Sequence, residues 1–376
     1  MTVELKKTVL HDWHVQNGGR MVPFAGWEMP VQYPSGPLQE HEVTRTIAGL
    51  FDIDHMGQME VRGPEAEAFV NQMVTYDVKQ MKLWDAHYSV LCYADGTCVD
   101  DIFIYKLPDE QKGGDTAYFF IAINASNREK DIQWFVSHSR EWNVTIKDIS
   151  DETYMLAFQG PKAVEILDRL VKSDLNQVPR FTAARESLFG VDVLLGRTGY
   201  TGEDGFELYF SADQAVKVWE GILEAGKADG VLPIGLAARD SLRFEACMPL
   251  YGHEINAGTT PVEAGLGFAL NLDKAFTGRD ALLKQKLEKS GRVAIGFEMV
   301  EKGVAREGYT VMANGKVIGH VSSGMYAPTL KKYLGMALVE RGTASVGSEI
   351  EIVIREKAVK AKVVKRPFYT PAYRRK

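Results

Sequence analysis

The chain has 376 residues, of which 45% are hydrophobic and 25% are charged, and its formal net charge is −6. These proportions are typical of a globular protein, and the length predicts two or three domains with a sizeable core. The acidic balance argues against a dedicated nucleic-acid surface. No stretch approaches the length of a membrane span. We therefore expect neither a nucleic acid nor a membrane as a partner.

The cysteines and the first residues indicate the cellular setting. Cys92, Cys98 and Cys247 form no Cys-x-x-Cys pair and have no zinc-site spacing. Three cysteines in this length fit a reducing compartment better than a disulfide framework. The N-terminus lacks the apolar core of a signal peptide. We expect a cytoplasmic protein, or a mitochondrial matrix protein if the source is eukaryotic, and no bound metal.

The first part of the chain mixes irregular and regular segments. Residues 8–35 are rich in glycine, proline and aromatic side chains, which predicts a packed segment without regular structure. A helix is expected over residues 38–47. Residues 51–61 then read as a strand with polar interruptions, which carries His55 and Met56.

Two later segments share the order strand, Gly-Pro, helix. Gly63-Pro64 predicts a helix start with proline at the first helical position, and Gly160-Pro161 repeats the pattern. The pattern is a weak sign of two related α+β modules, and chance can also produce it. The expected apolar faces, at helical spacing, are Ala66, Phe69, Val70 and Met73 in the first helix and Ala163, Ile166, Leu167 and Leu170 in the second.

Further helices are expected after residues 124 and 210. A strong strand over residues 117–123 ends at Asn124, and Ser126 with Glu129 predicts a capping box for the next helix. Residues 191–210 predict a hairpin, followed by a helix and then by another that begins near residue 234. The inward residues expected are Ile132, Phe135 and Val136 in the first of these helices, Val216, Trp219, Ile222 and Leu223 in the second, and Leu242 and Phe244 in the third.

From about residue 290 the sequence changes to short strands separated by turns. This spacing is typical of a small antiparallel barrel or sandwich. The sequence therefore predicts an α+β region up to about residue 280 and an all-β domain after it. The expected strands are 293–297, 309–312, 317–321, 334–339, 350–354 and 359–364.

Asp100 and Asp101 are adjacent carboxylates at the start of a predicted strand. Asp95-Gly96 predicts a hairpin turn before them, and a β-branched and aromatic run follows at residues 102–105. Side chains alternate along a strand, so the two carboxylates should point to opposite faces. This argues against a site built from the pair. Taken alone, two solvated carboxylates are the favoured interpretation, and one carboxylate facing a pocket is the alternative.

A second group of candidates surrounds a glycine-rich loop. Gly199, Gly202 and Gly205 match neither the dinucleotide-binding pattern nor the phosphate loop. A tight hairpin that needs glycine backbone angles is favoured. Alternatively, the loop brings Tyr200 and the carboxylates of Glu203 and Glu207 close to a ligand.

Glu207 follows in an otherwise apolar strand, and a buried carboxylate must be hydrogen-bonded or paired. It could pair with Arg239. It could also accept two adjacent N–H donors of a ligand, such as those on a pterin ring. His55, in contrast, is a lone histidine, which is more often structural than catalytic.

Several short runs follow one another in order along nearly the whole chain. They are residues 21–27, 51–57, 100–101, 124 with 128–131, 199–205, 235–243 and 251–252. Taken together, these runs resemble the T-protein of the glycine cleavage system, the family of tetrahydrofolate-dependent aminomethyltransferases. The resemblance implies an α+β fold of three domains around a central folate channel, with an all-β barrel last. The domains implied are 1–50 with 145–280 (folate-binding), 51–144 (carrying Asp100) and 281–376 (barrel).

The resemblance also implies roles for single residues. Asp100 matches the catalytic carboxylate, Glu207 the glutamate that holds the pterin edge, and Arg239 the arginine that assists it. Tyr373 matches a tyrosine near the folate entrance. Met56, Tyr88, Asn124 and Tyr200 match channel-lining positions.

The implied reaction transfers a one-carbon unit from an aminomethyl group on the lipoyl arm of the H-protein to tetrahydrofolate. Ammonia leaves, and 5,10-methylene-tetrahydrofolate forms. The implied partners are therefore the lipoylated H-protein and tetrahydrofolate, which acts as a co-substrate. Two other hypotheses are a folate-dependent demethylase of a small N-, S- or O-methylated compound and a non-catalytic folate-binding protein.

The chain departs from the family pattern at several positions. Asp54 replaces the usual serine, Cys247 followed by Met248 replaces a usual glycine, and Phe268 replaces a common tryptophan. These changes bear on the one-carbon donor more than on folate binding.

Overall fold

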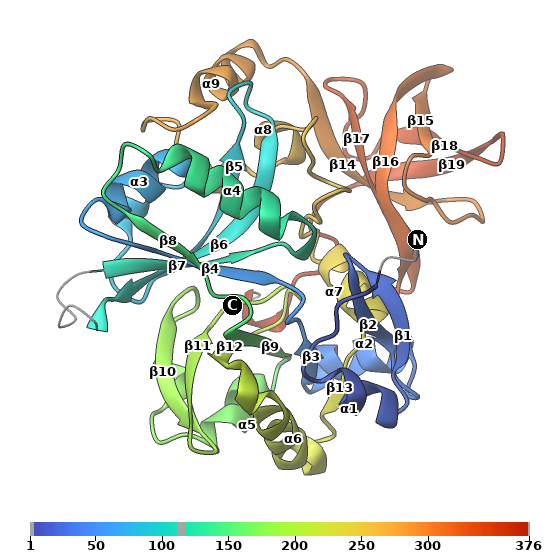
Figure 1. The fold of residues 1–376 in the computed structure, drawn as a ribbon. Helices are drawn as coiled ribbons and strands as arrows, with labels where there is room; N and C mark the ends of the chain where they lie inside the picture. The colour runs from blue at the N-terminus through green and yellow to red at the C-terminus, as the bar shows by residue number, and fades with distance from the viewer. Residues whose placement is uncertain (1–3, 111–116, 375–376) are drawn as a thin grey trace. The chain divides into compact units, whose positions relative to one another are not determined.

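The computed structural model describes residues 4–110 and 117–374, shown in Figure 1. The chain divides into two compact units, each built from several segments. The first unit consists of Met1–Val70, Val78–Tyr88 and Ile102–Asp240. The second consists of Asn71–Asp77, Ser89–Asp101 and Ser241–Lys376.

The N-terminal segment is regular, so the expectation of an irregular segment was wrong. Helix α1 (His11–Gln16) is followed by β1 (Arg20–Phe24) and β2 (Trp27–Gln32), which pair in an antiparallel two-stranded sheet. The turn between the strands has positive φ at Ala25 (48°) and Gly26 (84°), as in the tight turns that suit hairpins. Ala is an unusual residue for this conformation, which is why the turn gave no clear signal in the sequence.

The first unit contains a six-stranded sheet with the strand order β10-β11-β12-β9-β3-β13. Neighbouring strands are antiparallel, except for the parallel pair β3 and β13. The expected hairpin over residues 191–210 is formed by β11 and β12. The strands are β3 (Gly49–Asp52), β9 (Thr153–Gln159), β10 (Ala183–Leu188), β11 (Val191–Gly196), β12 (Gly205–Ser211) and β13 (Leu232–Pro233).

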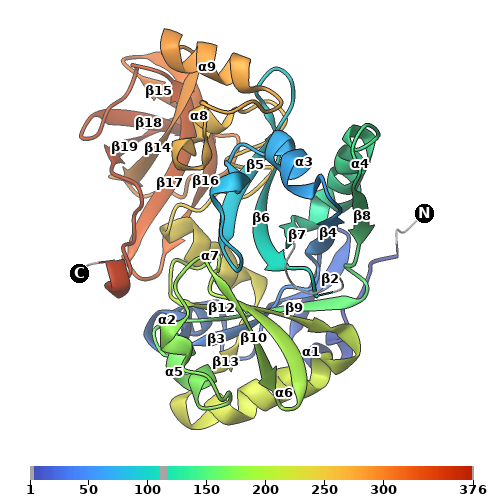
Figure 2. The same cartoon turned by 90° about the vertical axis from the view of Figure 1, so that its left-hand side faces the viewer.

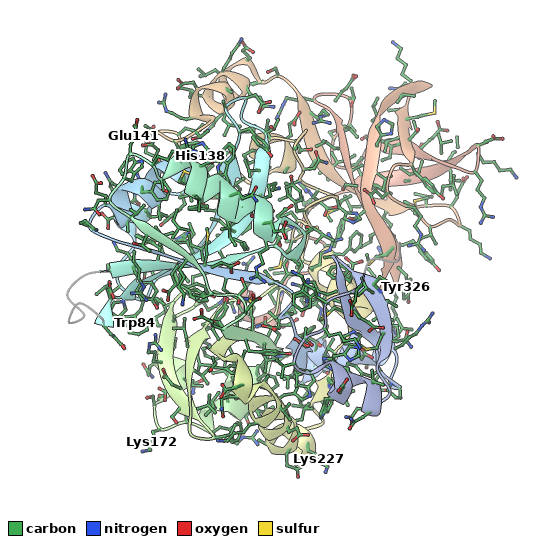
Figure 3. All side chains as sticks on the ribbon, viewed as in Figure 1. Trp84, His138, Glu141, Lys172, Lys227 and Tyr326 are labelled. Carbon is green, nitrogen blue, oxygen red and sulfur yellow. The ribbon has the colours of Figure 1, made fainter. Side chains whose placement is uncertain are left out.

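Helices α5 (Ala163–Asp168) and α6 (Ala215–Gly226) cover one face of this sheet, as Figures 1 and 2 show. Trp219 and Ile222 point into the core, as expected. Val216 does not, because it is 41% exposed and Val218 takes the inward position. The polar Lys227, directly after α6, projects away from the ribbon (Figure 3).

A second sheet has the order β5-β6-β7-β4-β8. The strand expected over residues 51–61 is divided between the two sheets, because β3 ends at Asp52 and β4 begins at Gly57. The intervening turn is closed by hydrogen bonds from the Met56 N–H to the Ile53 carbonyl (3.0 Å) and from the Asp54 N–H to an Asp52 carboxylate oxygen (3.1 Å). The strands of this sheet are β4 (Gly57–Arg62), β5 (Ala86–Cys92), β6 (Cys98–Pro108), β7 (Ala117–Ile123) and β8 (Thr145–Asp148).

Two helices are associated with the second sheet. Helix α3 (Ala66–Met73) begins two residues after Pro64, and its four expected apolar residues are buried. Helix α4 (Arg128–His138) begins after a short 3-10 turn, and no side chain caps it, so the predicted capping box is wrong. Phe135 of α4 packs edge-on against Phe69 of α3, with ring centroids 5.9 Å apart, whereas Val136 is 49% exposed.

The second unit contains a closed barrel with the order β14-β17-β16-β15-β18-β19. All six expected strands are present, and their inward residues form one apolar cluster. The prediction of a mixed α+β fold with a C-terminal all-β barrel is confirmed. The strands are β14 (Arg292–Met299), β15 (Thr310–Ala313), β16 (Lys316–Ala327), β17 (Lys332–Glu340), β18 (Glu349–Ile354) and β19 (Lys357–Val364).

The other helices link these parts of the chain. Helix α7 (Leu236–Glu245) follows β13, and Leu242 and Phe244 are fully buried, as expected. Helices α8 (Pro261–Ala264) and α9 (Arg279–Glu288) precede the barrel. None of the helices within residues 4–110 and 117–374 is long and apolar enough to cross a membrane.

Candidate active site

Glu207 lies in the middle of β12 in the first unit. Its neighbours Phe206 and Leu208 belong to the core beneath α5 and α6, so alternation turns Glu207 and Tyr209 to the opposite face of the sheet. On that face Tyr209 packs against Phe120 of β7, with ring centroids 4.8 Å apart. Glu207 is therefore a carboxylate, 8% exposed, on the face that meets aromatic side chains of the second sheet.

Three hydroxyl groups donate hydrogen bonds to one oxygen of this carboxylate. The Oε2 atom accepts from Thr198 (2.5 Å), Tyr105 (3.3 Å) and Tyr209 (3.4 Å). No described residue donates to Oε1. Burial raises the pKa of Glu207, while the Thr198 hydrogen bond and the positive charge of Arg239 act against this rise.

Arg239 on α7 connects Glu207 to two other predicted site residues. Its Nη2 donates to the Met56 sulfur at 3.8 Å, and its guanidinium lies 4.6 Å from the centre of the Tyr200 ring. Its charge also acts on Glu207. The first unit thus brings together Met56, Tyr200, Glu207 and Arg239, four residues that are far apart in the sequence.

The remaining predicted residues of the first unit are Asn124 and Tyr88. Asn124 follows β7 and Met56 precedes β4, and the adjacent residues Ile123 and Gly57 are paired across these strands. Asn124 and Met56 therefore lie at the same end of neighbouring strands. Tyr88 is half-buried on β5, which is an edge strand of the second sheet and is separated from β4 by β6 and β7.

His55 lies in the turn between β3 and β4, and its expected position on a strand is wrong. It is 3% exposed, and its ring packs edge-on against Phe24. Burial lowers the pKa of His55 to about 3, and the charge of Arg239 acts in the same direction. The imidazole is therefore neutral at physiological pH.

The glycine-rich loop is a tight structural turn, as favoured from the sequence. Gly205 has φ of 151°, and a Cβ there would lie 2.2 Å from the Phe158 carbonyl oxygen. A Cβ on Gly199 would lie 1.8 Å from Oε1 of Gln159. Glu203 forms a buried ion pair with Arg45 at 3.0 Å, which accounts for its charge structurally.

Asp100 and Asp101 differ in burial, as strand alternation predicts. The expected hairpin turn is present, with hydrogen bonds from the Gly96 N–H to the Tyr93 carbonyl (2.9 Å) and from the Tyr93 N–H to the Thr97 carbonyl (2.8 Å). On β6, Asp100 is 0% exposed and Asp101 is partly exposed. The solvated-pair interpretation is therefore wrong for Asp100.

Asp100 and Tyr373 belong to the second unit. Tyr373 is partly exposed in a 3-10 turn (Ala372–Arg374), with the Arg374 guanidinium 5.8 Å from its ring centre. Phe268, one of the departures from the family pattern, is 74% exposed. Within the described ranges, no group of three or more His, Cys, Asp or Glu side chains could hold a metal ion.

Sequence reasoning missed the three hydroxyls around Glu207. Tyr209 lies two residues after Glu207 on the same strand, so the period of two places both on one face and was a usable signal. Thr198 lies in the glycine-rich loop, but nothing in the surrounding sequence indicated a contact with Glu207. Tyr105 lies 102 residues from Glu207 and comes from the other sheet, so no local pattern could reveal it.

Two family models match this chain. The model described as the GCVT N-terminal domain matches residues 10–274, and the model described as the glycine cleavage T-protein C-terminal barrel domain matches residues 292–370. The chain belongs to the glycine cleavage T-protein family. The resemblance inferred from the sequence is thereby confirmed.

Relatives of this T-protein family match over their full lengths. An aminomethyltransferase of Alkaliphilus oremlandii is 47% identical, with 98% of each chain covered, and one of Symbiobacterium thermophilum is 46% identical, with 100% of each covered. The crystal structure of the glycine cleavage system aminomethyltransferase T from Bartonella henselae has a TM-score of 0.90 and 31% identity, covering 98% of this chain and 99% of that one. The predicted activity, a tetrahydrofolate-dependent aminomethyltransferase of the glycine cleavage system, is confirmed by these matches.

Proposed function

We propose that this chain uses Asp100 as its catalytic carboxylate and holds the folate through Met56, Tyr88, Asn124, Tyr200, Glu207, Arg239 and Tyr373. The observation that carries the proposal is the environment of Glu207. Its Oε2 is held by three hydroxyls, Oε1 has no donor among the described residues, and Arg239 is close enough to act on its charge.

Glu207 fits a pterin edge for a chemical reason. A carboxylate accepts two parallel N–H donors, and a 2-amino-4-oxo-pyrimidine ring offers two adjacent ones. Arg239 supplies donors for the ring carbonyl, and Tyr200 and Met56 supply flat and apolar surface beside it. Orientation of the folate by this group would account for a large part of the rate enhancement.

The proposed reaction balances without a metal or an oxidant. The two folate nitrogens each form a bond to the incoming carbon and lose one proton. The bonds from that carbon to its amino nitrogen and to the lipoyl sulfur break, the amino group leaves as ammonia, and the sulfur takes the second proton. Asp100, as a carboxylate, can stabilise the developing positive charge at a reacting nitrogen and relay a proton.

The proposal also covers the binding partners, the cellular compartment and the domain organisation of this protein. The donor is the aminomethylated lipoyl arm of the H-protein, tetrahydrofolate is the acceptor, and no metal, nucleic acid or membrane takes part. The chain works in the cytoplasm. Its three domains are 1–50 with 145–280, 51–144 and 281–376.

The test supplies the purified protein with tetrahydrofolate and aminomethylated H-protein and follows ammonia and methylene-tetrahydrofolate. We expect both products in equal amounts. Unmodified H-protein is the control and should give neither. If no product forms, but methyl-folate forms from a methylated small molecule, the demethylase hypothesis replaces this proposal. If folate binds and no donor reacts, the non-catalytic hypothesis replaces it.

A further inference from the structure

The three hydroxyls around Glu207 also contact one another. Tyr105 Oη lies 2.7 Å from Thr198 Oγ1 and 3.2 Å from Tyr209 Oη, so it touches every other member of the group. Tyr105 and Tyr209 are 0% and 3% exposed, and Thr198 is 4% exposed. We define these three residues as the hydroxyl chain. It is a buried polar network with one carboxylate at its end.

The number of protons limits which hydrogen bonds the hydroxyl chain can form at the same time. Each hydroxyl has one proton, and burial raises the pKa values of Tyr105 and Tyr209 well above their usual range, so both remain protonated. One proton serves one acceptor at a time, so the contacts allow two arrangements. In the first, all three hydroxyls donate to Glu207 Oε2. In the second, which follows the shortest contacts, Tyr209 donates to Tyr105, Tyr105 to Thr198 and Thr198 to Glu207, and each donor polarises the next.

The surrounding backbone leaves space for the hydroxyl chain. A Cβ on Gly196 would lie 2.5 Å from Tyr105 Oη, so only glycine at this position of β11 lets Tyr105 reach Thr198. Gln159 Nε2 donates to the Thr198 carbonyl at 2.9 Å and holds the loop in place. The three hydroxyls therefore come from β6, from the loop after β11 and from β12, and they converge on a single oxygen.

We propose that the hydroxyl chain orients Glu207 and keeps it a carboxylate, so that its Oε1 is presented to the N–H donors of the pterin, with Tyr105 as the central positioning residue. This rests on the folate-binding role proposed for Glu207. Burial alone favours the neutral acid, which has one acceptor too few for two N–H donors. Hydrogen bonds that point at the carboxylate oppose that effect.

Among the described residues, the titratable groups that act on the pKa of Glu207 include Tyr105 from β6, Tyr209 from its own strand and Arg239 from α7. Its partners in the neighbouring strands are Gly196 on β11 and Ala157 on β9, neither of which titrates. A shift in the ionisation of Glu207 on loss of one hydroxyl can therefore be assigned to that hydroxyl.

The test measures tetrahydrofolate affinity as a function of pH for Thr198→Val, Tyr105→Phe and Tyr209→Phe. At neutral pH we expect affinity losses of roughly 10- to 100-fold for Thr198→Val, several-fold for Tyr105→Phe and least for Tyr209→Phe, in the order of the hydrogen-bond lengths. Because each lost donor raises the pKa of Glu207, protonation should abolish binding from a higher pH than in the wild type. Thr198→Ser should restore both properties.

Tyr154→Phe is the matched control. Tyr154 is also fully buried in the first unit and donates to a carboxylate, Asp52, at 3.1 Å. We expect this variant to lose stability by a similar amount, with folate affinity and its pH dependence unchanged. If Thr198→Val and Tyr105→Phe bind folate like the wild type at every pH, the positioning role is wrong. If the wild type does not bind folate, the proposed function itself fails.

Discussion

Asp100 and Asp101 are adjacent residues with identical side chains, and they differ in how far each side chain is buried. The first is fully buried and the second is partly exposed, because successive side chains on β6 point to opposite faces. A buried carboxylate is restricted in orientation and shielded from competing water, so it acts more strongly on a developing charge than an exposed one. The proposed catalytic role therefore belongs to one residue of the pair.

Asp100→Asn should lower kcat by roughly 100-fold or more, the usual contribution of a positioned acid–base group, and should leave folate affinity nearly unchanged. Asn keeps the size of the side chain and removes its charge. Asp101→Asn is the matched control and should change kcat only slightly. Steady-state kinetics with aminomethylated H-protein and equilibrium folate binding check both. Equal losses in the two variants would contradict the assignment.

At the scale of the element, the end of α7 shows how one departure from the family pattern is accommodated. Cys247 has φ of 53°, a left-handed conformation that favours glycine. The N–H groups of Cys247 and Met248 donate to the carbonyls of Phe244 (2.9 Å) and Arg243 (3.0 Å), which is a helix C-terminal motif that favours a left-handed residue. The Cys247 side chain packs beside the Phe244 cluster, which offsets part of the strain.

Cys247→Gly should therefore be more stable than Cys247→Ala, by about 1 kcal/mol, because a left-handed backbone costs about that much for any residue with a Cβ. Both variants lose the sulfur, so the difference between their free energies of unfolding reports the cost of the left-handed backbone conformation. Denaturant unfolding measures it. The same pair at Cys98, a buried strand residue, is the control and should show the opposite order. An alanine variant that is the more stable at position 247 would refute the strain argument.

At the scale of the whole molecule, six of the proposed folate-binding residues belong to the first unit, whereas Asp100 and Tyr373 belong to the second. A ligand that binds only the folded state raises the free energy of unfolding by mass action. Folate should therefore stabilise chiefly the first unit, which contains Glu207 and Arg239. The barrel of the second unit has its own apolar core and can respond separately.

Tetrahydrofolate at a hundred times its Kd should raise the free energy of unfolding by about 2.7 kcal/mol. Scanning calorimetry should record an increase in Tm, which Glu207→Ala should abolish at the same ligand concentration. Aminobenzoyl-glutamate, which lacks the pterin ring, is the control ligand and should give a much smaller shift. An equal shift in the Glu207→Ala variant would remove this residue from the pterin site.

The sequence by itself determined those features that depend on local periodicity. The six barrel strands, the inward face of α3 and the opposite facing of Asp100 and Asp101 follow from spacings of two or of three to four residues. The ordered motifs also identified the family, because a series of short runs in the right order is specific even where each run is weak.

Only the tertiary structure decided the features that depend on distant residues. The break between β3 and β4 exists because the two strands join different sheets, which no local pattern shows. Val136 and Val216 satisfy the helical spacing but face outward, because neighbouring elements fix the rotation of each helix. The surroundings of Glu207 are the clearest example, since Tyr105 reaches it across 102 residues and through space that Gly196 leaves open.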